Sequence, residues 1–89
     1  MSLEALRQAA KRTVGVKQTE KAVLKKTAEC VYIACDADER VTVKLAGLCR
    51  DGGVATVCTE TMADIGKACG INVKAAAAGI LKADKGSGN

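Results

Sequence analysis

The chain has 89 residues, of which 48% are hydrophobic, and carries a formal net charge of +4 at pH 7. This length and composition predict one packed domain, since a chain of this size buries roughly 60–65% of its unfolded surface. Tyr32 is the only aromatic residue and histidine is absent, which excludes histidine-based catalysis, histidine metal ligation and base stacking on an aromatic platform.

The first third of the chain predicts a helix, a short extended segment and a second helix. Helical spacing of apolar residues indicates the first helix over residues 2–11. Residues 12–14 are extended in this prediction, and a second helix runs from about residue 17 to residue 26. The apolar positions of the first helix are Leu3, Leu6 and Ala10, and the inner side of the second holds Thr19, Val23 and Thr27.

The middle of the chain predicts a buried strand followed by a helix. Residues 30–35 form an unbroken apolar run rich in β-formers, which is typical of a strand covered on both faces. The segment Asp36–Asp38 ends this strand and supplies a helix cap. The next helix ends at Gly52–Gly53, and its apolar stripe consists of Val41, Leu45, Leu48 and Cys49.

The last third predicts a strand at residues 54–58 and a fourth helix. Thr61 and Asp64 form a plausible capping pair for this helix, and Gly70 ends it. Its inner side carries Met62, Ile65 and Cys69. Periodicity leaves residues 75–81 undecided, because alanine is the strongest helix former, while small side chains also suit a strand between two helical layers.

Helices and strands alternate along the whole predicted chain, which indicates the α/β class with helices on both faces of one small sheet. We expect a single domain over residues 1–82 and a flexible tail over residues 83–89. The sequence lacks a hydrophobic run of membrane-spanning length, and its first residues lack the pattern of a signal peptide. The predicted location is therefore the cytoplasm, without membrane association.

The cysteines predict core packing rather than a metal site or disulfides. They lie at wide, irregular spacings without a Cys-x-x-Cys pair, and their number is odd. Each falls within an apolar stretch, where cysteine behaves as a small hydrophobe. The residues are Cys30, Cys35, Cys49, Cys58 and Cys69.

The second predicted helix carries lysines on one face. Lys17, Lys21 and Lys25 follow at four-residue intervals, which places them on the same side. The helix begins after Gly15, and a helix N-terminus offers unpaired N–H groups and a positive dipole end to a phosphate or a base edge. A polyanionic partner is one interpretation, and an ordinary solvated basic face is the alternative that this stretch leaves open.

Four segments together resemble a known family. They are Gly15–Lys21, Ala34–Asp38, Leu45–Cys49 and Ile65–Ile71. In this order and spacing they are similar to the ribosomal protein family named for large-subunit protein L-seven-Ae, which includes L-thirty-e. The resemblance is greatest to the short bacterial paralogues of that family and spans about residues 3–82.

This resemblance implies a three-layer α/β/α sandwich with a mixed four-stranded sheet, in which residues 75–81 form the last strand. It also implies binding to RNA kink-turns, in which a short bulge lies beside a stem that opens with sheared G·A pairs. By position, the contacts to the G·A pairs and the flanking phosphates would fall on Gly15, Lys17, Gln18 and Lys21. The segment Ile71–Lys74 would form the loop that receives the extruded bulge nucleotide.

The side chains suit these roles chemically. Lys17 and Lys21 can donate to guanine O6 and N7 or to phosphate, and Gln18 can both donate and accept. Ile71 and Val73 offer apolar surface to an unstacked base, although core packing of one of the two is the alternative, because strands alternate. The predicted RNA-binding residues are Gly15, Val16, Lys17, Gln18, Lys21, Lys25, Ile71, Asn72, Val73 and Lys74.

Archaeal family members usually carry Asn-Glu where this chain has Lys17-Gln18, and Asn72 replaces a frequent acidic residue. Such exchanges raise phosphate attraction and reduce base-specific acceptor contacts. We therefore expect a non-enzymatic, monomeric kink-turn binder, in or near the ribosome or on regulatory RNA, without catalytic residues, metal or cofactor. The alternative is a protein-interaction module on the same fold.

Overall fold

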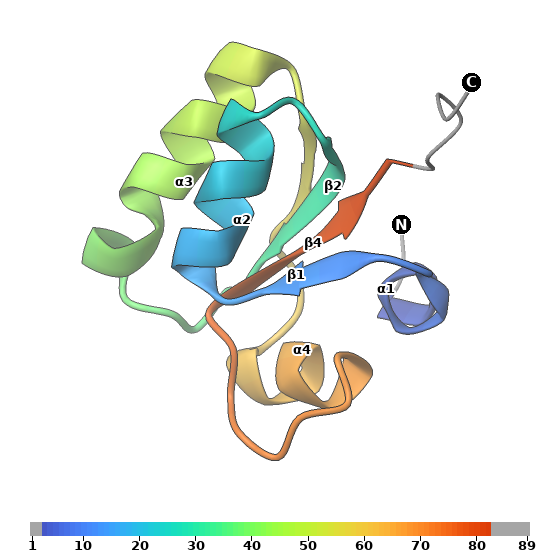
Figure 1. Cartoon of the computed structure of the whole chain (residues 1–89). Helices are drawn as coiled ribbons and strands as arrows, with labels where there is room; N and C mark the ends of the chain where they lie inside the picture. Colours follow the sequence, from blue (N-terminus) through green and yellow to red (C-terminus); the bar gives the residue numbers. More distant parts are fainter. Residues whose placement is uncertain (1–2, 83–89) are drawn as a thin grey trace.

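The computed structural model describes residues 3–82, which contain four helices and four strands in strict alternation (Figure 1). This order confirms the predicted alternation. The elements are α1 (Leu3–Gln8), β1 (Arg12–Val14), α2 (Val16–Leu24), β2 (Ala28–Ile33), α3 (Glu39–Gly52), β3 (Ala55–Val57), α4 (Met62–Ala68) and β4 (Ala77–Leu81). The chain start before Leu3 and the predicted tail at residues 83–89 lie outside the described residues.

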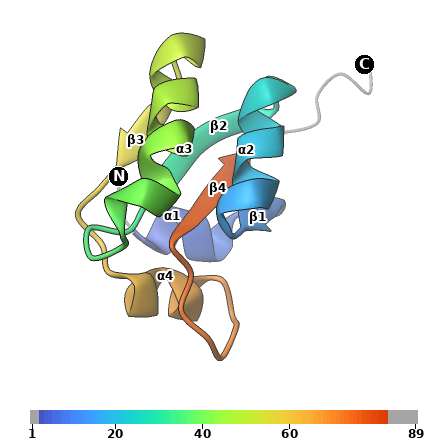
Figure 2. The same ribbon diagram turned by 90° about the vertical axis from the view of Figure 1, so that its left-hand side faces the viewer.

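The strands form one mixed sheet in the order β1-β4-β2-β3. β4 runs antiparallel to both of its neighbours, and β2 and β3 pair in parallel. Helices α2 and α3 cover one face of the sheet, and α1 and α4 cover the other (Figures 1 and 2). The three-layer α/β/α sandwich and the mixed four-stranded sheet are therefore confirmed.

The alanine-rich segment is a central strand, not a helix. Ala77 and Ala78 are fully buried, one in each of the two hydrophobic clusters that lie on opposite faces of the sheet. A Cβ atom on Gly79 would lie 2.9 Å from the hydroxyl oxygen of Thr13 on the neighbouring strand. Burial between two helical layers thus favours small side chains here and overrides helix propensity.

The expected helix ends are largely confirmed. Gly53 adopts a left-handed conformation (φ 68°) at the C-terminus of α3. The Thr61 hydroxyl accepts a hydrogen bond from the backbone N–H of Asp64 at the start of α4 (3.1 Å). The Asp38 carboxylate accepts one from the backbone N–H of Arg40 and pairs with the Arg40 guanidinium, both at 2.9 Å. These contacts fix where both helices begin.

The Asp38 cap predicts a loss of stability in acid. Hydrogen bonds from the side chain and the backbone N–H of Arg40 lower the pKa of Asp38. Since the folded pKa lies below the unfolded one, the stabilisation is complete above about pH 4 and is lost as the pH falls through the folded pKa. Asn caps without a charge, so thermal melts of Asp38→Asn should differ from wild type at pH 7 and converge near the folded pKa. A constant difference would contradict this role.

Several sequence-based details were wrong. Helix α1 ends at Gln8 instead of residue 11, because the chain turns there into β1, and Ala10 is exposed. Thr27 follows α2 and is also exposed. Val41 is 49% exposed, because the face of α3 that meets the sheet carries Thr42, Leu45 and Cys49.

The cysteine prediction holds for three of the five residues. Cys30, Cys49 and Cys69 are buried, and burial raises the pKa of each thiol. Cys35 and Cys58 are exposed because they follow the ends of β2 and β3. Within residues 3–82, no helix has the length and apolar character needed to cross a membrane.

Candidate functional site

The junction between β1 and α2 depends on the backbone of Gly15. This residue adopts φ 95° and ψ 157°, a conformation that only glycine occupies readily. Its N–H donates a hydrogen bond of 2.8 Å to the carbonyl oxygen of Ala77, the first residue of β4. The start of α2 is thereby attached to the point where the α4–β4 connection enters the sheet.

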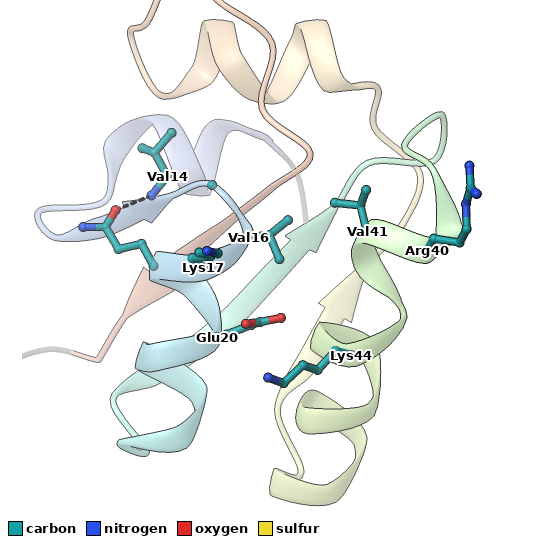
Figure 3. Close-up of a pocket in the computed structure, with 9 residues that line it drawn as sticks. Val14, Val16, Lys17, Glu20, Arg40, Val41 and Lys44 are labelled. Atoms are coloured by element: carbon teal, nitrogen blue, oxygen red, sulfur yellow. Dashed lines mark hydrogen bonds between the residues drawn. The ribbon is translucent and has the colours of Figure 1, made fainter.

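Gln18 is held by the turn that precedes its own helix. The backbone N–H of Val14 donates to the Gln18 Oε1 atom at 2.9 Å (dashed line in Figure 3). Because that partner is a donor, one lone pair of the amide oxygen is engaged, and the Nε2 group of the exposed side chain keeps both of its N–H donors available. The Oε1 atom keeps its second lone pair, so the prediction that Gln18 can both donate and accept at a ligand stands.

A buried pair of hydroxyls supports the same turn from inside. Thr19 is fully buried, and its hydroxyl lies 2.8 Å from that of Thr13 on β1. The Thr19 hydroxyl also donates to the carbonyl oxygen of Gly15 at 2.7 Å. These bonds hold the first turn of α2 against the edge of the sheet and leave its outer side to solvent.

That outer side has the predicted basic character. Lys17, Lys21 and Lys25 are all exposed, and the first turn of α2 contains no acidic residue. Among the residues that the structure describes, the backbone N–H groups of residues 16–18 have no acceptor. Lys25 lies about 12 Å along the helix from Lys17, at 1.5 Å per residue, so it sits at the far end of α2 from Gly15.

The second predicted segment, Ile71–Lys74, lies in the connection between α4 and β4, which packs directly on α4. A Cβ atom on Gly66 would lie 2.1 Å from the carbonyl oxygen of Val73. The N–H groups of Ile71 and Ala75 donate to the carbonyl oxygens of Gly66 and Met62, each at 3.1 Å. The connection is therefore held at both ends by backbone hydrogen bonds, and it approaches so closely because residue 66 has no side chain.

Between α4 and this connection lies a recess of about 270 Å³. Its lining consists of Ala63, Lys67, Ile71, Asn72, Val73 and Lys74. Ile71 packs against the core, whereas Val73 is 68% exposed. Both predicted apolar residues line the recess, but they differ in burial, and Val73 is the one that offers the larger exposed apolar surface.

Arg12 positions the base of the connection, a role that the sequence did not indicate. Its guanidinium donates to the carbonyl oxygen of Cys69 at 3.2 Å, and to those of Arg7 and Ala9 at 3.4 Å. It therefore bridges the C-terminal ends of α1 and α4. An arginine within a short strand gives no sequence signal for the contact to α4, because the Cys69 carbonyl oxygen lies 57 residues away along the chain.

The two predicted segments lie at the same end of the molecule (Figures 1 and 2). In both views the orange connection between α4 and β4 runs up to the sheet beside the first turn of α2, where the Gly15–Ala77 hydrogen bond joins them. The tertiary fold brings Gly15–Gln18 close to the entry of β4, while Lys25 lies away from it.

Sequence reasoning also missed the wall that α3 adds beside α2. A groove of about 850 Å³ separates the first turns of the two helices. Its α3 side is lined by Arg40, Val41 and Lys44. Spacing of three and four residues could have signalled a shared face of α3, but Val41 was assigned to the core.

Comparison with known proteins agrees with this architecture. The family model described as "Ribosomal protein L7Ae/L30e/S12e/Gadd45 family" matches residues 2–87. The chain belongs to this family. The resemblance expected from the sequence motifs is thereby confirmed.

Relatives within this family include small bacterial proteins. "RNA-binding protein TTE2299" of Caldanaerobacter subterraneus is 48% identical over 68 residues, covering 76% of this chain and 83% of the relative. "RNA-binding protein YbxF" of Geobacillus stearothermophilus is 38% identical over 82 residues, covering 92% and 100%. The solved structure of a Giardia lamblia 15.5kD RNA binding protein has a TM-score of 0.82 at 32% identity, with 92% and 72% covered.

Proposed function

We propose that this protein binds RNA, and that its target is the kink-turn. The first turn of α2 would meet the sheared G·A pairs, with Lys17 and Lys21 on phosphates or guanine acceptors and the Gln18 Nε2 group donating to a base edge. The recess beside Val73 would receive the extruded nucleotide. Family membership and the names of the relatives support RNA as the partner.

The observation that carries the proposal is the hydrogen bond from the Gly15 N–H to the Ala77 carbonyl oxygen. It holds a helix start rich in free donors beside a connection with an exposed apolar side chain. A bent RNA with a bulge offers phosphates, purine edges and one unstacked base within a short distance, because bulging opens the otherwise inaccessible deep groove. The two segments are complementary to those features.

The proposed mechanism is a population shift. The protein would bind the bent form of the RNA more tightly than the extended form, and so favour bending without a chemical step. In this proposal the protein is a monomer without enzymatic activity, is located in the cytoplasm, and binds ribosomal or regulatory RNA.

Fluorescence energy transfer on a doubly labelled kink-turn duplex tests this function. Titration with the protein should raise transfer as the duplex bends. The same duplex with its G·A pairs replaced by Watson–Crick pairs should neither bend nor bind at comparable concentrations. Equal binding to both duplexes would refute kink-turn recognition and leave only general attraction to RNA.

Lys21→Ala should weaken binding by about 1–3 kcal/mol and lower the salt dependence by about one ion, because one cation is lost from the RNA-facing side of α2. Fluorescence anisotropy over a range of salt concentrations measures both effects. Arg7→Ala is the matched control, since Arg7 is an exposed cation on α1, in the opposite helical layer. Equal losses in the two variants would contradict the assigned face.

A further inference from the structure

The groove between α2 and α3 has no assigned role and differs in chemistry from the recess on α4. Figure 3 shows its two walls, with Val16, Lys17 and Glu20 on α2 and Val41 and Lys44 on α3. The volume of about 850 Å³ is roughly three times that of the recess, at about 270 Å³. It continues directly from the first turn of α2, because Lys17 and Gln18 line it as well.

The floor of the groove is apolar. Val16 and Val41 point toward one another from the two helices (Figure 3). Val41 is 49% exposed, while Thr42, Leu45 and Cys49 form the side of α3 that packs on the sheet. Val41 therefore contributes little to the core and leaves an apolar surface open to solvent.

Charged groups line the rim. Lys44 extends from α3 toward α2, and Glu20 extends from α2 toward Lys44 (Figure 3). Arg40 points away from the groove and is paired with Asp38, which raises the pKa of its guanidinium. Lys17 and Lys44 are therefore the cations that flank the valines, with the Glu20 carboxylate between the two helices as the single opposing charge of the described lining.

We propose that this groove holds the sugar–phosphate backbone of the bound RNA, with Lys44 contacting a phosphate and the two valines packing on a ribose. Such a strand alternates anionic phosphates with apolar ribose faces, and the groove offers cations beside an apolar floor. The inference rests on the proposed function and extends it. The interface of α2 then continues across to α3, and Glu20 weakens it by repelling phosphate.

A charge-matched pair of variants tests the Lys44 contact. Lys44→Gln should weaken kink-turn binding about three- to tenfold and lower the salt dependence by about one ion. Arg50→Gln removes the same charge from an exposed position near the other end of α3, outside the groove lining, and should leave affinity within about twofold. Equal losses in both variants would overturn the proposal.

A second pair of variants removes negative charges instead of positive ones, and the expected change in affinity is in the opposite direction. Glu20→Gln removes the opposing carboxylate and should tighten binding about two- to fivefold. Glu29→Gln removes the same charge from β2, where the side chain is exposed and lies outside the groove lining, and should have little effect. Unchanged or weaker binding by Glu20→Gln would also overturn the proposal.

Neutral methylphosphonates placed one at a time along the RNA identify the contact. At the phosphate that Lys44 contacts, the substitution should weaken binding by the wild-type protein but should not weaken binding by Lys44→Gln any further. Failure to find such a position would exclude a phosphate contact. A different result would refute the proposed function itself, namely equal binding of the wild-type protein to the duplex with sheared G·A pairs and to the duplex with Watson–Crick pairs. A wild type that discriminates between the duplexes while Lys44→Gln binds like wild type refutes this inference alone.

Discussion

Replacement of Gly66 with alanine should displace the α4–β4 connection and abolish most kink-turn binding. The added Cβ would lie 2.1 Å from the Val73 carbonyl oxygen, and this neighbour is backbone, which cannot rotate away as a side chain can. Forced shifts of this kind cost about 1–3 kcal/mol of unfolding free energy. If a displacement cost of this size is lost from the binding free energy, affinity should fall by about tenfold or more, because a tenfold change corresponds to ~1.4 kcal/mol.

Chemical denaturation measures the stability change, and anisotropy under fully native conditions measures affinity separately. Gly47→Ala is the matched control, because its Cβ would meet only the Arg50 Nη2 atom at 3.9 Å. That substitution lies within α3 and should stabilise the protein by about 0.4–1 kcal/mol through helix propensity. A Gly66→Ala protein with wild-type stability and affinity would show that the connection can move without consequence.

Gly15→Ala should be nearly as damaging, for a conformational reason instead of a steric one. No atom lies within 4 Å of the Cβ that the substitution would add, but φ is 95°. Holding an L-residue there costs about 1–3 kcal/mol, or the turn changes shape and the hydrogen bond to Ala77 is lost. In either case the start of α2 is no longer held at the entry of β4, so binding should weaken together with stability.

Amide hydrogen exchange can detect this loss at one residue. The Gly15 N–H donates to Ala77 in the wild type, so the corresponding amide should lose protection in Gly15→Ala. The control is Gly52→Ala, where the added Cβ would make ordinary contacts of 3.8–3.9 Å with two valines. Retained protection with unchanged kink-turn affinity would show that the junction does not depend on a positive φ at residue 15.

Local sequence features predicted the element order well, because each depends on nearby residues. The apolar run at residues 30–35 indicated β2, now seen at Ala28–Ile33. Thr61 and Asp38 indicated helix starts by side-chain capping, which acts within two or three residues. The lysine spacing of α2 likewise placed three cations on one exposed face, because helical periodicity alone determines which residues share a side.

Other features required long-range contacts. The run of alanines was undecided until its position between two helical layers made it β4, since burial there overrides propensity. Val41 was assigned to the core because periodicity identifies a stripe but not which neighbour the stripe meets. The roles of Gly66 and Arg12 depend on backbone carbonyls of other elements, at residues 73 and 69, and no local pattern encodes those.

The sequence by itself therefore determined the α/β class, the alternation of elements, the basic face of α2 and the family. Only the tertiary structure decided that the first turn of α2 meets the entry of β4 and that α3 adds Lys44 beside α2. It also decided that Val73, and not Ile71, is the more exposed apolar side chain of the α4–β4 connection. The physical reason is the range of the interactions. Propensity, capping and periodicity act over a few residues, whereas a site assembled from α2, α3 and the α4–β4 connection depends on how the sheet brings distant segments together.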